Sequence, residues 1–328
     1  MNPPGPVVVM GAGSIGCYVG GRLQAAGVPV HFVGRPRVLQ ALREHGLRLT
    51  DLDGGDVTLP PASLSLHESP PPGAAALALL TVKSAATAEA AAQLPAGSLV
   101  LSLQNGVSNA ATAGAAAPGC TVLAGMVPFN VAELAPGHYH RGTSGQLAAQ
   151  DHAALAPWLP VFTRAGLPLQ THRDMRAVQW GKLLLNLNNP VNALSGLPLR
   201  AQLLDRDYRL VTAALQREAL AALAAAGIRP AQLTPVPPAR LPAVLGLPTW
   251  LFRIVAARSL RIDAQARSSM ADDLALGRRT EVDALCGEVV RLAQAAGGRA
   301  PLNERIGALV ENDPRPRGAR ELRAALGV

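Results

Sequence analysis

A short apolar segment near the start of the chain runs directly into a glycine-rich turn. The stretch "VVVMGAGSIG" (7–16) has the spacing GxGxxG, and the residues after it have a helical pattern that ends near Gly27. In such a strand–turn–helix, one glycine permits the tight turn, one lets a pyrophosphate approach the backbone, and one lets the helix pack on the strand. The alternative is an ordinary glycine-rich turn. The flanking strand and helix favour a dinucleotide site formed by Gly11, Ala12, Gly13, Ser14, Ile15 and Gly16.

The end of the second apolar segment indicates which dinucleotide is bound. The segment "VPVHFV" (28–33) is followed by "GRPR", and no carboxylate comes before Glu44. A site for NAD would place Asp or Glu here for the ribose hydroxyls, whereas an arginine suits a 2′-phosphate. We therefore expect NADPH or NADP+ as the cofactor, with Arg35 on the phosphate. Arg37 is the weaker candidate, and the alternative for both residues is a solvated surface arginine.

Strand and helix patterns alternate through the first half of the chain. Apolar runs at 75–82 and 98–103 are each followed by a helical stretch, residues 36–45 have a helical pattern, and 47–60 has the pattern of a hairpin around Gly54 and Gly55. Such alternation is typical of a parallel sheet that is covered on both faces. After about residue 172 the pattern is mainly helical, with an amphipathic run over 200–226, a proline-rich loop over 230–242 and a largely helical stretch over 269–296.

The sequence thus predicts two domains, for which 328 residues are sufficient. Over residues 1–172 we expect an α/β Rossmann-type domain with a doubly wound parallel sheet. Over residues 173–328 we expect an all-α helical domain that carries the substrate side of the site.

The basic charge of the chain does not indicate nucleic-acid binding. The 30 Lys and Arg residues exceed the 22 Asp and Glu residues, which gives a formal net charge of +8, but they are scattered singly along the chain. Such a charge favours solubility and the attraction of small anions. Every apolar stretch of about 18 residues contains a charge or a helix breaker, so we expect no membrane span.

The start of the chain and its cysteines favour a cytoplasmic location. The stretch "MNPPGPVVVMGAG" lacks the basic region and the long apolar run of a signal peptide. The three cysteines are widely spaced and form no CxxC pair, which fits a reducing compartment and no structural metal. His138 and His140 alternate on one face of a predicted strand, but no third ligand is near in sequence, so we expect no metal site.

Lysine is almost absent from the chain. Only Lys83 and Lys182 are lysine, and the other basic residues are all arginine. Arginine stays protonated in proteins, whereas a desolvated lysine can lose its proton. Lys83 follows an apolar strand, where ligands bind in open α/β sheets, and Lys182 shares a predicted helix face with Asn186. Asn188 and Asn189 follow, and since asparagine is a poor helix former, we expect this group to hydrogen-bond a ligand, although chance can also place residues so.

A stretch of acidic residues lies further along the second half. The sequence "RSSMADDLALGRRTEVD" (267–283) contains Ser269, which with Asp272 is a candidate helix cap. In one continuous helix Ser269 and Glu281 would lie about 18 Å apart. Both can therefore contact one small substrate only if Ser269 lies in a bend or before the helix. For most of these acids the alternative is a solvated helix face.

Six stretches of the chain resemble the ketopantoate reductase (2-dehydropantoate 2-reductase) family. They are, in the family's order and approximate spacing, "GAGSIG", "TVKS", "LQNGV", "GKLLLN", "SSMADD" and "TEVD", and with the first strand they span about residues 7 to 290. The family has an N-terminal Rossmann domain and a C-terminal helical domain, which agrees with the organisation predicted above.

The resemblance implies roles for single residues. Lys182 matches the family's catalytic lysine, and Glu281 matches a glutamate near the nicotinamide and that lysine, so both are expected to be catalytic. On the cofactor side the resemblance adds Lys83, Asn105 and Val131, the last through its backbone, and it also places Glu281 there.

On the substrate side the resemblance implies contacts from Asn105, Lys182, Asn186, Asn189 and Ser269, with Ser269 on the substrate carboxylate. The chain departs from the family here, because the family's second asparagine falls on Pro190, eight residues after the lysine. Either one residue is deleted and Asn189 takes the role, or the role is lost. A further family asparagine aligns near Leu199 and is absent.

The resemblance implies that NADPH reduces a small anionic 2-oxo acid, 2-dehydropantoate, to pantoate in pantothenate biosynthesis. Protonated Lys182 would polarise the keto oxygen and then donate its proton. The alternatives are a reductase of the same fold for another 2-oxo acid or an imine, and a non-catalytic NADP(H)-binding regulator. The presence of Lys182, Asn105 and Glu281 argues against the regulator. The helical domain is also compatible with a homodimer.

Overall fold

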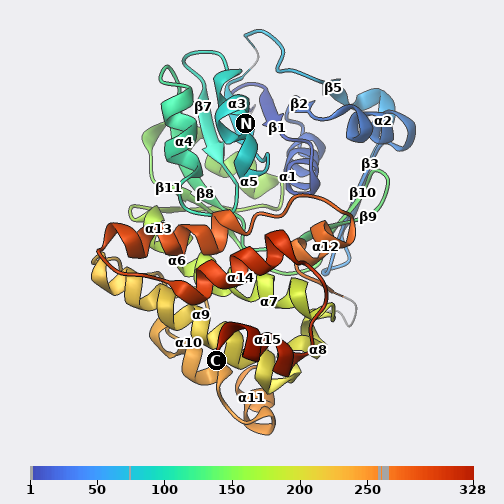
Figure 1. Ribbon diagram of the computed structural model, residues 1–328. Coiled ribbons are helices and arrows are strands. Elements are labelled where there is room, and N and C mark those ends of the chain that lie inside the picture. The colour runs from blue at the N-terminus through green and yellow to red at the C-terminus, as the bar shows by residue number, and fades with distance from the viewer. Residues whose placement is uncertain (1–2, 74, 258–259, 261–265) are drawn as a thin grey trace. The chain divides into compact units, whose positions relative to one another are not determined.

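The computed structural model describes residues 3–73, 75–257, 260 and 266–328. Its internal contacts divide the chain into two units, Met1–Met175 and Arg176–Val328. All strands of the described chain lie in the first unit, and the second unit is built from helices (Figure 1).

The first unit contains a large, mainly parallel sheet. Its strands lie in the order β12-β11-β8-β7-β6-β1-β2-β5, and all neighbours are parallel except β11 and β8. The strands are β1 (Val7–Met10), β2 (Val30–Val33), β5 (Ser65–His67), β6 (Leu77–Leu80), β7 (Leu99–Ser102), β8 (Thr121–Met126), β11 (Leu147–Gln150) and β12 (Leu169–His172).

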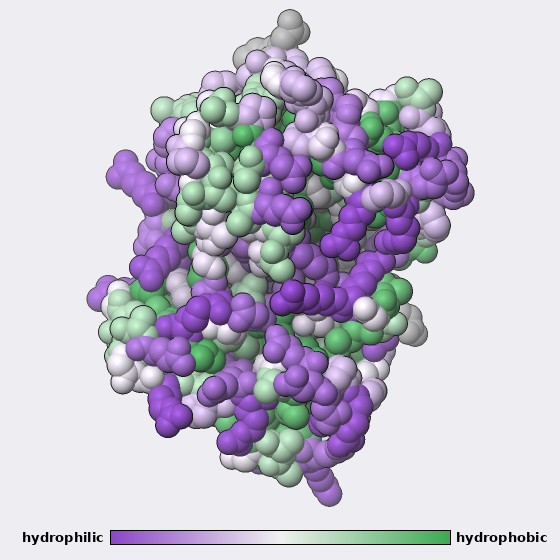
Figure 2. All heavy atoms as spheres, turned by 45° about the horizontal axis from the view of Figure 1, so that its top comes forward, coloured by the Kyte–Doolittle hydropathy of each residue, from purple (hydrophilic) through white to green (hydrophobic). Residues whose placement is uncertain are grey.

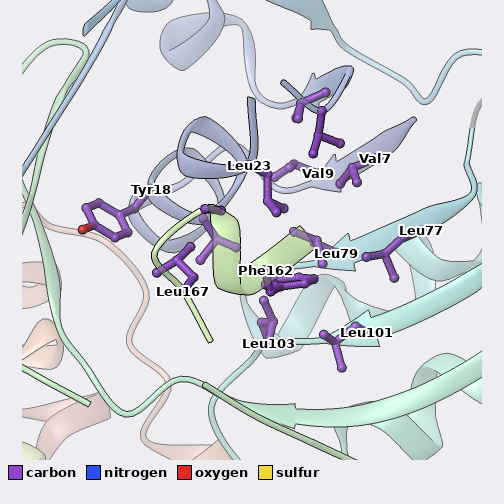
Figure 3. Packing of buried hydrophobic residues seen from close by; sticks show 14 of the residues in the cluster. Val7, Val9, Tyr18, Leu23, Leu77, Leu79, Leu101, Leu103, Phe162 and Leu167 are labelled. Atoms are coloured by element: carbon purple, nitrogen blue, oxygen red, sulfur yellow. The ribbon is translucent and has the colours of Figure 1, made fainter. Parts of the chain in front are cut away.

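Both faces of this sheet are buried. On β1, Val7 and Val9 pack into one apolar cluster with α1 (Ser14–Ala25) and α5 (Leu159–Arg164), and Figure 3 shows part of this cluster. Val8 and Met10 point the other way and pack with α3 (Thr87–Ala92) and α4 (Asn109–Ala116). Because both faces are covered, these strands are continuous apolar runs in the sequence. The doubly wound parallel sheet predicted from the sequence is confirmed.

A smaller sheet, in the order β4-β3-β10-β9, completes the first unit. Its strands are β3 (Leu47–Asp51), β4 (Asp56–Leu59), β9 (Val131–Ala135) and β10 (His138–Arg141). The predicted hairpin is confirmed, because β3 and β4 pair antiparallel and Leu47 lies opposite Leu59. In its turn, the Asp51 carboxylate accepts hydrogen bonds from the N–H groups of Asp53 and Gly55. The other elements of this unit are α2 (Pro36–His45) and the short helices η1 (Pro61–Ser63), η2 (Ser84–Ala86) and η3 (Ala153–Trp158).

The second unit is all-α in its described part. Its elements are α6 (Met175–Asn186, which starts at the boundary), α7 (Asn188–Ser195), α8 (Leu199–Leu204), α9 (Arg206–Ala225), η4 (Pro238–Arg240), α10 (Leu241–Leu245), α11 (Thr249–Val255), α12 (Ser269–Ala275), η5 (Asp283–Gly287), α13 (Glu288–Ala295), α14 (Pro301–Asn312) and α15 (Ala319–Leu326).

The helical runs predicted for this unit are more interrupted than the sequence pattern indicated. The run over 200–226 is two helices, because Asp205 is extended and its side chain accepts the Asp207 N–H to begin α9. The run over 269–296 also breaks after α12 and resumes as η5, a π-helical turn, which leads into α13. Hydrophobic periodicity continues through such breaks because it does not depend on the backbone bonds at each residue.

A buried arginine holds several segments of the second unit together. Arg209 on α9 is fully buried, and its guanidinium donates hydrogen bonds to the carbonyl oxygens of Leu203, Leu245 and Leu247 at 2.8–3.0 Å. The guanidinium carbon also lies 4.2 Å from the centroid of the Phe252 ring. The planar fork of donors thereby satisfies carbonyl groups that the ends of α8 and α10 would leave unpaired.

No described helix is both long enough and apolar enough to cross a membrane. The face of the molecule in Figure 2 mixes hydrophilic and apolar residues, without one continuous apolar area. Exposed apolar side chains scattered in this way are normal for a folded protein.

Candidate active site

The glycine-rich turn between β1 and α1 has the geometry of a phosphate-binding loop. Gly11 has φ +110°, and a Cβ there would lie 2.6 Å from the Val82 nitrogen. A Cβ on Gly16 would overlap the Gly11 carbonyl oxygen. In contrast, no described atom outside its chain neighbours lies within 4 Å of where a Cβ on Gly13 would be. Two glycines therefore serve close packing, and the third leaves space at the start of α1.

The turn is fixed from two neighbouring strands. The Gly11 and Ala12 N–H groups donate to the Val33 carbonyl oxygen at 3.0 and 2.8 Å, which ties the turn to the end of β2. The Thr81 hydroxyl, which follows β6, donates to the Gly11 carbonyl oxygen at 2.8 Å. No side chain of the described residues caps the N-terminus of α1, so its first N–H groups and its dipole can receive an anion.

Arg35 lies directly after β2, beside this turn. It is the N-cap residue of α2, its side chain is exposed, and it forms no ion pair with a described residue. The Gly34 N–H donates to the His67 carbonyl oxygen at 3.0 Å, which fixes the backbone just before Arg35. Arg37 is also exposed, within the first turn of α2. The open space at Gly13 and the uncapped N-terminus of α1 together fit the phosphates of a dinucleotide, and Arg35 adds a cation at the end of β2.

A buried polar network joins the loops after β6 and β7. The Gln104 amide donates to the Val82 carbonyl oxygen at 2.9 Å and to the Thr87 hydroxyl at 2.7 Å. The Asn109 amide donates to the Ser84 hydroxyl and to the Asn105 carbonyl oxygen. Sequence reasoning did not single out Gln104, Thr87 or Asn109. The sequence signal for these residues was weak, because an amide or hydroxyl that follows a strand does not indicate which group it will hydrogen-bond.

This network positions two of the predicted residues. Lys83 is the N-cap residue of η2, between Val82 and Ser84, and is half-buried. Asn105 is half-buried in the loop after β7 and is held through its carbonyl oxygen. Both therefore lie on loops at the carboxyl ends of parallel strands, where open α/β sheets bind ligands. Val131 lies apart from these loops in the chain, at the start of β9 in the smaller sheet.

In the second unit, Lys182 and Asn186 lie one turn apart on α6. The backbone of another segment approaches closely at the preceding residue, Gly181. A Cβ there would overlap the Ala231 carbonyl oxygen. Ala231 also donates its N–H to the Ala177 carbonyl oxygen at 2.8 Å. The proline-rich loop thus packs along α6 beside Lys182. Lys182 is half-buried, and this burial lowers the pKa of its side chain to about 8.

The asparagines after Lys182 separate into different roles. Asn188 begins α7 and exchanges two hydrogen bonds with Gln202 at 3.1 Å, and it accepts a third from Thr212. Its role is therefore structural, and the expectation that it faces a ligand is wrong. Asn189 contacts the "SSM" segment through its backbone, since its carbonyl oxygen accepts a hydrogen bond from Ser268 at 3.5 Å.

The start of α12 is held against α7 by Asn192, which sequence reasoning missed. Asn192 is fully buried, its Oδ1 accepts the Ser268 N–H at 2.9 Å, and its Nδ2 donates to the Leu197 carbonyl oxygen. The predicted cap at Ser269 is wrong, because the Ser268 hydroxyl accepts the Ala271 N–H and caps α12. Ser269 is the first helical residue and is exposed, which leaves its hydroxyl available to a ligand.

Glu281 is not in one helix with Ser269. It lies in the segment after α12, directly before Val282 and the π-helical turn η5. The linear separation expected for a continuous helix therefore does not apply. Turns of π-helix occur frequently at functional sites.

His138 and His140 lie on one face of β10, as the alternation predicted. Both contact the hydroxyl of Thr50 on β3, at 3.0 and 2.8 Å. Within the described residues, no group of three or more His, Cys, Asp or Glu side chains is arranged to hold a metal ion.

Two protein-family models match the chain. "Ketopantoate reductase PanE/ApbA" matches residues 7–154, and "Ketopantoate reductase PanE/ApbA C terminal" matches residues 174–312. A 2-dehydropantoate 2-reductase of Halobacterium salinarum is 34% identical over 300 residues, which cover 88% of this chain and 92% of that protein. The chain belongs to the ketopantoate reductase family. It is therefore an oxidoreductase of a family that depends on pyridine nucleotides.

Solved structures agree with this family assignment. A PanE/ApbA family ketopantoate reductase from Ralstonia eutropha JMP134 is 32% identical with a TM-score of 0.78, over 93% of this chain and 97% of that one. D-mandelate dehydrogenase, solved with NADH and anilino(oxo)acetate, shares the fold at 18% identity, with a TM-score of 0.76 over 98% of this chain and 100% of that one. The Rossmann-type domain followed by a helical domain is thus the arrangement of ketopantoate reductases.

The contrast between Gly13 and Gly16 predicts different effects of one added methyl group. Gly13→Ala should leave stability within about 0.5 kcal/mol of wild type, because the backbone there is extended and the space is open. It should raise the Kd for a reduced pyridine nucleotide at least about tenfold, since the methyl occupies the space over the start of α1. Gly16→Ala should instead destabilise the protein by about 1–3 kcal/mol through overpacking.

Urea denaturation and titration of nucleotide fluorescence separate these two effects. Wild-type nucleotide affinity in Gly13→Ala would show that the loop does not carry the phosphates.

Proposed function

We propose that this chain catalyses the NADPH-dependent reduction of 2-dehydropantoate (ketopantoate) to pantoate, a step of pantothenate biosynthesis. The observation that carries the proposal is the half-buried Lys182 on α6, with its pKa lowered to about 8 by burial. Such a group is largely protonated at neutral pH and can still release its proton within reach of physiological conditions. The 34% identity with a 2-dehydropantoate 2-reductase supports the choice of reaction.

The residues of the glycine-rich turn would hold the cofactor. Its pyrophosphate would lie on the N–H groups of Ser14 to Gly16, in the space that Gly13 leaves open, and its 2′-phosphate would lie on Arg35. Lys83, Asn105 and the Val131 backbone would make further contacts on this side. When bound, NADPH supplies the hydride that is added to the keto carbon.

Lys182 would act on the keto oxygen. Its ammonium donates a hydrogen bond to that oxygen and stabilises the negative charge that grows there as the C=O π electrons move to oxygen. The proton then passes to the oxygen, which leaves a hydroxyl group on the product and a neutral amine on Lys182. Glu281 would orient this lysine and the nicotinamide side of the site.

The other substrate contacts would come from hydroxyl and amide groups. We place Ser269 on the substrate carboxylate, because it is exposed at the start of α12, and Asn186 and Asn189 beside Lys182. The Asn105 amide would contact the substrate from the loop after β7. Together these groups give a small anionic 2-oxo acid several donors.

A second candidate is reduction of a different 2-oxo acid or of an imine by the same residues. One observation favours it, because the asparagines that follow Lys182 do not repeat the family spacing. Pro190 stands at the expected position, and Asn188 is engaged with Gln202 and Thr212 inside the second unit. The residues that recognise the rest of the acid would therefore differ from those of the family.

Substrate and proton donor can be tested together by following NADPH oxidation at 340 nm. Wild type should turn over ketopantoate and prefer NADPH to NADH, and Lys182→Ala should lower kcat by about 10²–10⁴-fold because the proton donor is lost. Lys182→Arg keeps the charge but holds its proton, so it should also lose most activity. Turnover of another 2-oxo acid alone would favour the second candidate, and tight NADPH binding without any turnover would favour a regulator.

The pH dependence of the reaction follows from the pKa of Lys182. The proton donor must be charged, so log(kcat/KM) should be level below pH 8 and fall with a slope of −1 above it. The free energy of unfolding should change with pH in the opposite direction. The lysine of the unfolded chain keeps its proton up to about pH 10.5, so stability should rise between pH 8 and that value. A kcat/KM that stays level to pH 10 would exclude Lys182 as the donor.

We also propose that the chain works as a homodimer in the cytoplasm. Trp250 and Ile254 lie one turn apart on α11 with 67% and 66% of their surface exposed, and large apolar side chains of this kind are common in subunit interfaces. A ketopantoate reductase from Staphylococcus aureus is described as dimeric. Sedimentation velocity should give twice the chain mass of 33.8 kDa, and a single species of one chain would contradict the dimer.

A further inference from the structure

Asn192 lies where the helical backbone that carries Lys182 meets the segment that carries Ser269. It belongs to α7, and α7 packs on α12. Leu187, which separates α6 from α7, keeps a right-handed helical backbone, and its N–H donates to the Leu183 carbonyl oxygen at 3.0 Å. The backbone after Lys182 therefore stays helical as far as Asn192.

The Asn192 amide makes a hydrogen bond at each end. Asn192 is fully buried, its Oδ1 accepts the Ser268 N–H at 2.9 Å, and its Nδ2 donates to the Leu197 carbonyl oxygen at 2.9 Å. Its own carbonyl oxygen accepts the Ser195 hydroxyl at 2.8 Å, and that hydroxyl accepts the Leu197 N–H at 3.1 Å. Only the nitrogen end of the amide can donate to Leu197, so these bonds also fix which end faces Ser268.

Ser268 depends on this amide because it is the N-cap residue of α12. The N–H of an N-cap residue has no acceptor within its own helix, and Asn192 supplies one. The Ser268 hydroxyl accepts the Ala271 N–H at 3.2 Å and donates to the Asn189 carbonyl oxygen at 3.5 Å. Because α12 has only 7 residues, its first turn is held mainly by such contacts with α7. Ser269 is the next residue, so they also place its hydroxyl.

We propose that Asn192 is a positioning residue for the reduction of a 2-oxo acid. Through Ser268 it sets where the Ser269 hydroxyl lies relative to the Lys182 ammonium. The carboxylate and the keto group of a 2-oxo acid are on adjacent carbons, so both contacts form together only at one separation of these two groups. Asn192 is too deeply buried to touch the substrate itself. This role rests on the reaction proposed for Lys182 and Ser269.

Asn188, four residues earlier on α7, provides a matched comparison. Its amide exchanges hydrogen bonds with Gln202 on α8 and accepts one from Thr212 on α9. The loss of either asparagine removes amide bonds between α7 and another segment of the second unit. Only the loss of Asn192 releases the segment that carries Ser269. Substitutions at the two positions therefore separate a general loss of packing from the loss of a defined position.

Steady-state kinetics of the full chain with NADPH and ketopantoate test the role. Leucine has nearly the shape of asparagine but makes no hydrogen bond, so Asn192→Leu should raise the KM for ketopantoate at least about tenfold and lower kcat by a smaller factor. The Kd for NADPH, from titration of its fluorescence, should stay within about twofold, because the glycine-rich turn is unchanged. Asn188→Leu should lower the unfolding temperature but leave KM within about twofold.

A conservative variant tests whether the bond to Ser268 is the one that matters. Asn192→Asp keeps an oxygen that accepts the Ser268 N–H, and burial favours its protonated form, which can also donate to the Leu197 carbonyl oxygen. Its KM should therefore stay within about threefold of wild type. A rise in Asn192→Asp equal to that in Asn192→Leu would contradict the role of this bond.

A double-mutant cycle tests whether Asn192 acts through Ser269. Ser269→Ala removes the hydroxyl that Asn192 positions, so adding Asn192→Leu to Ser269→Ala should raise KM by no more than about twofold. A structural role would give independent effects, and the two increases in KM would then multiply. If Asn192→Leu does not fold, Asn192→Ala is measured in the same cycle.

The kinetics of wild type distinguish a failure of this role from a failure of the proposed reaction. Turnover by wild type with an unchanged KM in Asn192→Leu, or with independent effects in the cycle, would overturn the role of Asn192 and leave the reaction standing. If wild type reduces a different 2-oxo acid, the same variants should show the same pattern with that acid. If wild type reduces no 2-oxo acid, the proposed reaction fails and the positioning role fails with it.

Discussion

The first unit depends on the close contact between the glycine-rich turn and the backbone after β6. At Gly11 the turn lies so near Thr81 and Val82 that a side chain has no room, and the Thr81 hydroxyl closes the contact with a hydrogen bond. The ends of β1, β2 and β6 therefore meet at one point, which sets the start of α1 and the position of the loop with Lys83. A binding surface made of backbone and short side chains results, and its shape is fixed by the sheet itself.

Much of this unit could be predicted because its signals are local. The GxGxxG spacing, the apolar strands and the hairpin around Gly54 each depend on residues that are neighbours in the sequence. Two of the predictions that failed concern side chains with partners far along the chain. Asn188 is tied to Gln202 and Thr212, and Ser268 caps α12 while held by Asn192, which lies 76 residues earlier. No periodicity carries information about such pairs.

Three of the candidate residues, in both units, lie on segments that buried amides hold in place. Gln104 and Asn109 fix the loops that carry Lys83 and Asn105, and Asn192 fixes the segment that carries Ser269. An amide can donate and accept at once, so a single side chain can hold two loops at defined distances. Few side chains are then needed to contact substrate or cofactor, because the backbone that carries them is already positioned.

Arg209 shows why the two basic side chains are not exchangeable everywhere in this chain. Three carbonyl oxygens and an aromatic ring surround one planar guanidinium, and the compact ammonium of a lysine could not face them all. Arg209 and Lys182 restrict the choice of cation for opposite reasons. At Arg209 the arrangement of acceptors excludes lysine. On the proposed mechanism, arginine cannot replace Lys182, because the residue must release a proton.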